Sequence, residues 1–347
     1  MPRGVAIALV LGLAVTAAAQ NTAGRATVLP TTELSTIQDL TPPEFTQPPV
    51  HSIESEPPAG GWYAGVEFLY VTPRERGLDF ALVDPRNDLV PAGTMQSLNY
   101  KPSPGVRAAI GYKLPGRGWD IGVAYTYFTA TDEFGVAAPD GALLYPSLTR
   151  AGLTNESQIA AARTRLTLNV YDITAGRTWE FDESSRLRFF GGVRLATIRQ
   201  TLEATYSGRD ADAAAIDLRS QYDGAGPLFG AESWLGLGDG LGLFGRATAG
   251  MLTGTMRTPF SETNNGGATL YADLRDRFAL TVPVVTLGVG ISYEYRGVFV
   301  RLGYEVTNFI GLFERPTFVD DFAQGKIVRQ SNNLALDGFF IQLGLSF

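Results

Sequence analysis

Ten segments of this 347-residue chain alternate apolar residues with small or polar ones. The last of them, "LDGFFIQLGLSF", places Phe339, Ile341, Leu343, Leu345 and Phe347 on one face of a strand and small or polar residues on the other. Connections of about 2 to 6 residues alternate along the chain with connections of about 20 to 35. This arrangement is typical of a transmembrane β-barrel, whose apolar face contacts lipid.

A soluble β-sandwich also buries one apolar face. It has no reason, however, to sort short and long connections to opposite ends. We therefore predict an all-β fold at residues 61–347: a transmembrane, antiparallel, up-and-down β-barrel with short periplasmic turns and long external loops. About ten strands are expected. Twelve is the alternative, because "GLDFALVD" and "TMQSLNY" in the first long connection also alternate, although we expect them to extend the first two strands above the membrane.

The fourth segment, about Arg165 to Thr178, is less regular than the others. The parity of its apolar residues switches near Val170 and Tyr171. One extra residue in the strand would produce such a switch, so the sequence predicts a β-bulge there.

Two N-terminal segments are expected to lie outside the barrel. Residues 1–19 combine Arg3, an apolar run from Val5 to Val15 and an A-x-A cleavage site, which predicts a signal peptide and export. That run is too short to cross a bilayer. Residues 20–60 are rich in proline and lack periodicity, so we expect a disordered periplasmic segment that could reach the cell wall.

The composition excludes several classes of function. A net charge of −7 and a pI near 4.9 argue against a nucleic-acid partner. The chain has no cysteine, and its one histidine, His51, lies in the proline-rich segment. A histidine-activated nucleophile is therefore not expected, and we predict that the protein is not an enzyme and has no cofactor or metal site.

Twelve charged residues fall on the polar faces of the predicted strands, which line the lumen of a barrel. They are Glu67, Arg107, Lys113, Asp120, Asp172, Arg188, Arg194, Glu232, Arg246, Glu294, Arg301 and Glu305. Two roles stay open for them: a charge-lined permeation path, or ion pairs that fill a narrow barrel. Ten strands should leave at most a thin passage, because barrels of about eight strands are filled and wide pores have about sixteen.

Aromatic residues gather near the short connections, as a girdle at the membrane interface would. They are Trp62, Tyr112, Trp119, Trp179, Tyr295 and Phe347. The terminal Phe347 resembles the signal that outer-membrane barrels present to the barrel-assembly machinery. We expect this machinery, outer-membrane lipid and lipopolysaccharide to be the partners of the chain.

Five stretches resemble the Legionella major outer membrane protein family of pore-forming barrels. They are "WYAGVEFLYVTP", "SPGVRAAIGYKLP", "FFGGVRLATI", "YDGAGPLFGAESWL" and "LDGFFIQLGLSF", which run in order from about residue 60 to 347. The resemblance implies a porin-like passive channel for small solutes or ions in the cell outer membrane. The alternative is a non-conducting structural or adhesive barrel that acts through its external loops and N-terminal segment.

Overall fold

The computed structural model describes residues 60–86, 92–116, 118–182, 184–320, 322 and 326–347. The predicted signal peptide and the proline-rich segment up to residue 59, with His51, lie outside these residues. Within them, no helix is long and apolar enough to cross a membrane. The regular elements of the described part are all β-strands.

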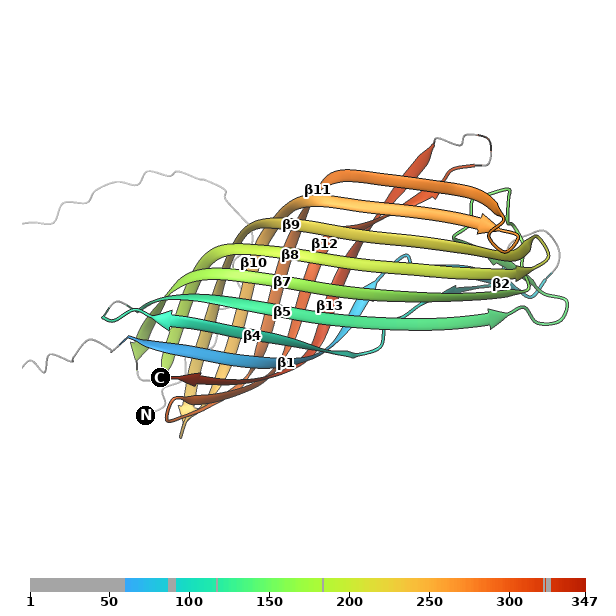
Figure 1. Ribbon diagram of the computed structural model, residues 1–347. Helices are drawn as coiled ribbons and strands as arrows, with labels where there is room; N and C mark the ends of the chain where they lie inside the picture. Colours follow the sequence, from blue (N-terminus) through green and yellow to red (C-terminus); the bar gives the residue numbers. More distant parts are fainter. Residues whose placement is uncertain (1–59, 87–91, 117, 183, 321, 323–325) are drawn as a thin grey trace, which may run out of the picture. The chain divides into compact units, whose positions relative to one another are not determined.

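Ten antiparallel strands close into one barrel (Figure 1). They are β1 (Gly61–Glu75), β4 (Ser103–Lys113), β5 (Trp119–Ala137), β7 (Ile159–Asp182), β8 (Ser185–Gly208), β9 (Ala211–Gly238), β10 (Leu241–Asn264), β11 (Thr269–Tyr295), β12 (Val298–Phe318) and β13 (Ile327–Ser346). Each strand pairs with its neighbours in this order, and β1 pairs with β13 to close the ring. Closure removes the free sheet edges that lipid could not satisfy. The predicted strand number is confirmed.

Tight turns join the strands at one end of the barrel. The β9–β10 turn consists of Asp239 and Gly240, and the β11–β12 turn of Arg296 and Gly297. All four residues have a positive φ, as a two-residue type I′ hairpin turn requires. In outer-membrane barrels the short turns are periplasmic, so we call this the turn end and the opposite one the outer end.

At the outer end, the long connections between membrane segments are mostly strand rather than loop. Only Arg209 and Asp210 separate β8 from β9, and only residues 265–268 separate β10 from β11. Polar and apolar residues still alternate in these extensions, so they keep the strand conformation. The wall therefore continues well beyond the length that a bilayer requires.

Three short strands lie apart from the wall and form what we call the inner sheet. They are β2 (Asp79–Asp84), β3 (Thr94–Ser97) and β6 (Leu143–Pro146), in the order β3-β2-β6. The prediction that the stretches in the first long connection extend the first two wall strands was wrong, as was the alternative of twelve wall strands. Their alternation is satisfied by pairing within the inner sheet instead.

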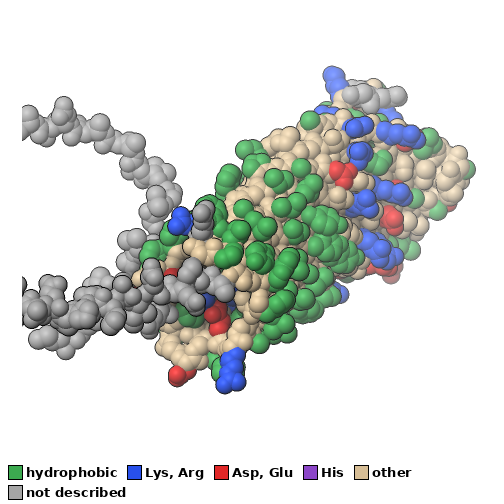
Figure 2. Space-filling model, turned by 60° about the vertical axis from the view of Figure 1, so that its left-hand side comes forward, with side chains coloured by type: hydrophobic (Ala, Val, Ile, Leu, Met, Phe, Trp, Pro, Cys, Tyr) green, Lys and Arg blue, Asp and Glu red, His purple; other side chains and the backbone are tan. Residues whose placement is uncertain are grey.

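Outward-facing residues of the turn-end half form an apolar belt, which appears as a green band in Figure 2. Val289 and Phe339, for example, have 67% and 61% of their surface exposed. Water would not tolerate so large a continuous apolar surface, whereas lipid does. Trp62, Trp119 and Tyr295 are exposed at the turn-end border of the belt, where an interfacial girdle belongs.

The inward-facing residues change character along a strand although the facing itself does not change. On β7, Asp172 faces the lumen in the turn-end half, and Leu166 and Val170 are buried inside the outer half. The strand pairs with β5 and β8 without a register shift through Val170 and Tyr171, so the predicted β-bulge was wrong. In the turn-end half the apolar surroundings are outside, where lipid lies. In the outer half they are inside, in a protein core, so the apolar residues change parity along the strand.

The outer half of the barrel encloses that hydrophobic core. Inward-facing Ile198, Leu202, Leu252 and Phe309 belong to one buried cluster with Phe80 of the inner sheet. The outer half is therefore packed in the manner of a soluble protein interior.

Candidate functional site

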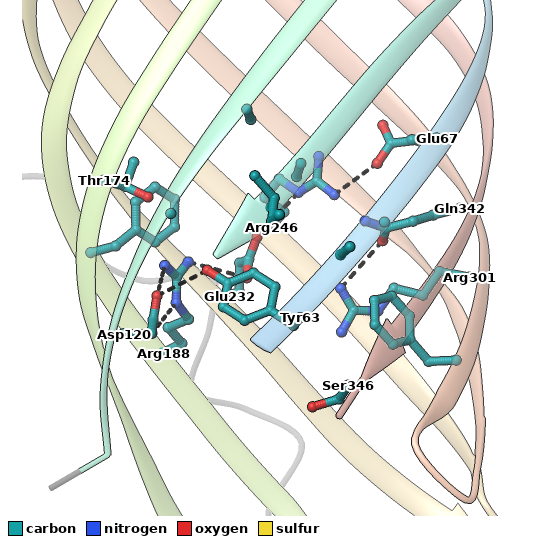
Figure 3. Close-up of a pocket in the computed structure, with 18 of the residues that line it drawn as sticks. Tyr63, Glu67, Asp120, Thr174, Arg188, Glu232, Arg246, Arg301, Gln342 and Ser346 are labelled. Carbon is teal, nitrogen blue, oxygen red and sulfur yellow. Dashed lines mark hydrogen bonds and ion pairs between the residues drawn. The ribbon is translucent and has the colours of Figure 1, made fainter. Parts of the chain in front are cut away.

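A cavity of about 570 Å³ occupies the turn-end half of the lumen, and we call it the vestibule (Figure 3). All twelve charged residues singled out from the sequence lie on its wall. Tyr295, Gly297 and Ser346 also line it, so the vestibule reaches the periplasmic end of the barrel. The polar faces of ten strands therefore surround one water-accessible space.

Four charged residues form a closed network at the inner limit of the vestibule. Arg107 donates to both Glu67 and Glu305, with 2.7 Å between its Nη2 and Glu305 Oε1. Arg246 bridges the same two carboxylates at 3.2 Å and 3.1 Å. Glu67 and Glu305 are 1% and 5% exposed, and a buried carboxylate is tolerated when more than one charged donor holds it.

Further ion pairs line the wall beside this charge network and between it and the turn end. Arg194 holds Asp172 through two parallel hydrogen bonds of 2.7 Å. Arg188 donates to Asp120, with 2.8 Å from its Nε, and lies 3.5 Å from Glu232. Strand register explains two of these contacts, since Arg194 is directly opposite Asp172 and Arg188 directly opposite Glu232.

Three cations of the vestibule have no carboxylate partner among the described residues: Lys113, Arg296 and Arg301. Arg301 donates to Gln342 at 3.4 Å, and its guanidinium lies 4.4 Å and 4.6 Å from the ring centres of Phe244 and Phe299. Lys113 Nζ lies 3.3 Å from Ser346 Oγ. The described lining contains eight cations and six carboxylates, so the vestibule has an excess of two positive charges.

Arg186, which the sequence pattern did not single out, also lines the vestibule. Its Nη2 lies 2.6 Å from Glu294 Oε2, and its guanidinium stacks on Trp234. In the sequence the apolar alternation of this strand becomes clear only from Leu187, which predicts a start there, whereas β8 begins at Ser185. Arg186 has the same parity as Arg188, so the signal was present one residue beyond the predicted boundary.

A second cavity of about 50 Å³ shares Arg107, Arg194 and Glu305 with the vestibule. Its other walls are mainly apolar and include Leu69 and Phe128, which follow the charged residues toward the outer end. The charge network thus separates a wet, charged space from the start of the hydrophobic core.

Contacts from several wall strands hold the inner sheet across the outer half of the lumen. Arg315 of β12 donates to the carbonyl oxygens of Gly77 at 3.2 Å and Ser147 at 2.7 Å. Tyr206 of β8 donates to the carbonyl oxygen of Phe80 at 2.7 Å. Because β8 and β12 are separated by three strands in the ring, these anchors lie on different sides of the barrel.

The chain has a distant likeness to solved outer-membrane proteins. The outer membrane protease OmpT from Escherichia coli is 12% identical, with 83% of this chain and 97% of that chain covered and a TM-score of 0.47. The Pseudomonas putida toluene transporter TodX is 11% identical, with 84% and 91% covered and a TM-score of 0.34. These values are too low to bear on function. No curated protein matches the sequence.

A family model covers the whole of the described barrel. The model, described as Legionella pneumophila major outer membrane protein precursor, matches residues 56–347. This range includes the ten wall strands, the inner sheet and every residue of the vestibule. The chain therefore belongs to the Legionella major outer membrane protein family and is a β-barrel of the outer membrane.

Proposed function

We propose that this barrel is a narrow channel for small solutes or ions and that the inner sheet closes it in the conformation described here. The observation that carries the proposal is the vestibule. It holds about 570 Å³ of space, reaches the periplasmic end and is lined by fourteen charged side chains. A barrel that served only as an anchor could fill this space with apolar side chains, as its own outer half does.

The closed part of the route begins at the charge network. Beyond it lie the small second cavity and then the hydrophobic core with the inner sheet. Ions do not cross a dry apolar core. Conduction therefore requires the inner sheet to move. Its strands of four to six residues pair with one another and not with the wall strands.

The charge of the vestibule predicts the preferred solute. Its excess of two positive charges raises the local concentration of anions and disfavours cations. Arg301, which no carboxylate neutralises among the described residues, contributes directly to this excess. Replacing Arg301 with Gln should shift the reversal potential in a salt gradient toward cation preference.

Planar-bilayer recording of the refolded protein tests the proposal. The Arg315→Gln variant should open more often than the unaltered protein, because the inner sheet loses a cationic donor to two of its flanking carbonyl groups. Arg163→Gln, on the outward face of β7, removes the same charge away from the inner sheet and should leave gating unchanged.

A bulky residue in the vestibule provides the second arm. Thr174→Trp should lower the single-channel conductance, because Thr174 faces the cavity (Figure 3). Gly192 is unsuitable for this purpose, since a Cβ there would meet the carbonyl oxygen of Ile173 at 1.9 Å and disrupt the wall.

The second candidate function is a non-conducting outer-membrane barrel, and the packed outer half favours it. In that case the vestibule is a dead end and its ion pairs only stabilise the wall. A complete lack of conductance steps in both the unaltered protein and Arg315→Gln, with the barrel shown to be folded, would establish this candidate and refute the channel.

A further inference from the structure

Arginine side chains gather on the outward face of β7 to β11, just beyond the apolar belt. In one cross-strand row, Arg199 pairs with Gln221, Gln221 with Arg257, and Arg257 with Arg277. In the next row outward, Arg165 pairs with Thr201 and Thr201 with Arg219, and Arg275 follows on β11. All six arginines are exposed. We call them the arginine patch, and the blue side chains along one border of the green belt in Figure 2 show this basic rim.

The protein itself neutralises the patch only in part, through Glu203, Asp217 and Asp273 in the next row outward and Asp223 in the next row inward. The two rows contain no carboxylate. Arg219 and Arg257 pair with Asp217 and Asp223 of adjacent rows at 2.6 Å and 2.7 Å. The other four arginines have no ion pair among the described residues.

Two of the arginines face each other directly. Arg257 and Arg277 are cross-strand partners in the β10–β11 register, and like charges in such positions destabilise a sheet. Nothing in the fold requires them there, because they face away from the core. An external anion that bridges both guanidinium groups would remove the repulsion.

The height of the patch above the belt indicates which anion is available. Arg199 lies four residues beyond Leu195, an exposed apolar residue of the belt on β8, and Arg257 lies six residues beyond Met251 on β10. At about 3.3 Å per residue and a tilt of about 40°, this is roughly 10 to 15 Å above the hydrocarbon border. The headgroups of a phospholipid leaflet reach only about 5 to 8 Å beyond the hydrocarbon, so an anion at the height of the patch belongs to a lipid with a larger headgroup.

We propose that the arginine patch binds the phosphorylated headgroup of the outer-leaflet glycolipid, lipopolysaccharide. Guanidinium groups bind phosphate through two parallel hydrogen bonds, and six of them on adjacent strands form a surface wide enough for a headgroup with more than one phosphate. Arg74, on β1, lies outside the patch and forms an ion pair with Asp337. The proposed surface therefore covers only the side of the barrel that β7 to β11 form. This site is independent of whether the lumen conducts.

Glycolipid binding to the refolded protein in detergent micelles tests the proposal. The probes are a lipopolysaccharide that carries its headgroup phosphates and the same lipid after enzymatic dephosphorylation. The patch variant is Arg199→Gln with Arg257→Gln and Arg277→Gln. The control variant, Arg74→Gln with Arg177→Gln and Arg329→Gln, removes three exposed arginines from other places. Native mass spectrometry or fluorescence titration measures affinity, and heat-modifiable migration on gels verifies folding.

The unaltered protein should bind the phosphorylated lipid about tenfold or more tightly than the dephosphorylated one. The patch variant should lose about the same factor, the control variant should stay within about twofold, and added salt should weaken binding. Equal affinity for the two lipids, an unchanged patch variant, or an equal loss in the control would each overturn the proposal. Displacement of the lipid by inorganic phosphate at matched phosphate concentration would also overturn it, because the occupant would then be a free anion.

Discussion

Near the turn end, β7 directs Ile173 to lipid and Asp172 to the lumen, whereas further along the same strand it directs Arg165 outward and Leu166 into a core. The register of β7 with β5 and β8 does not shift between these points. What differs is the medium on each side: lipid outside and water inside for the turn-end half, water outside and protein inside for the outer half. Side-chain polarity along a barrel strand therefore reports its surroundings at each height.

The two halves also differ in what their inward-facing side chains contact. The turn-end half keeps charges that pair across strands around an open vestibule. The outer half excludes water and depends on apolar packing around the inner sheet. An outer-membrane barrel can thus combine a membrane channel wall with a compact, soluble-like core in one continuous sheet. Paired substitutions on single strands test this contrast.

The largest effect is expected from a charge in the outer core. Leu202→Asp places a carboxylate at a position that is 3% exposed, where it finds no water, so the free energy of unfolding should fall by about 3 kcal/mol or more. Thr201→Asp, one residue away and outward, should change it by no more than about 0.5 kcal/mol. Urea unfolding in lipid vesicles, followed by tryptophan fluorescence, measures both. Equal small losses would mean that the outer half is not a dry core.

The lipid face of β11 should show a slightly smaller effect. Val289→Arg exposes a cation to the middle of the apolar belt and should destabilise the barrel by about 3 kcal/mol. Ala279→Arg, which is outward on the same strand but beyond the belt, should be nearly neutral. The same unfolding experiment compares the two variants. If both destabilise equally, the border between lipid and water on this strand has been placed wrongly.

The smallest effect concerns the pH dependence of the outer half. Glu75 lies on β1 beyond Tyr70, an exposed aromatic residue of the belt, and accepts a hydrogen bond from Gln200. Loss of surrounding water raises the pKa of Glu75 from 4.5 to about 8. The folded protein therefore binds this proton more tightly than the unfolded chain does, and stability falls as the pH rises from 4.5 toward 8.

Because part of the Glu75 side chain remains accessible, we expect this loss to be about 1 kcal/mol. Glu75→Gln cannot ionise and should flatten the profile between pH 5 and pH 8. Unfolding curves at several pH values measure the slope, and a slope of equal size in the Gln variant would assign the pH dependence to another group.

Several features of the site could be predicted because a β-strand has a strict period of two. Once the parity of Glu67, Asp172 and Arg194 was assigned, their common facing followed from backbone geometry alone. Arg186 was missed only because strand boundaries are uncertain by a residue or two. The identity of ion-pair partners was not predictable, since Arg107 reaches Glu305, a residue far away in the sequence.

The amino-acid sequence by itself determined the wall: alternating segments, turn residues that accept a positive φ, and an apolar surface that only lipid can cover. Only the tertiary structure decided what fills the lumen. The inner sheet, the core around Leu202 and the apolar switch on β7 depend on which surfaces meet after the ring closes. Local periodicity specifies that a residue faces in or out, but not whether water, lipid or protein is on that side, because this depends on contacts between segments that are distant in the chain.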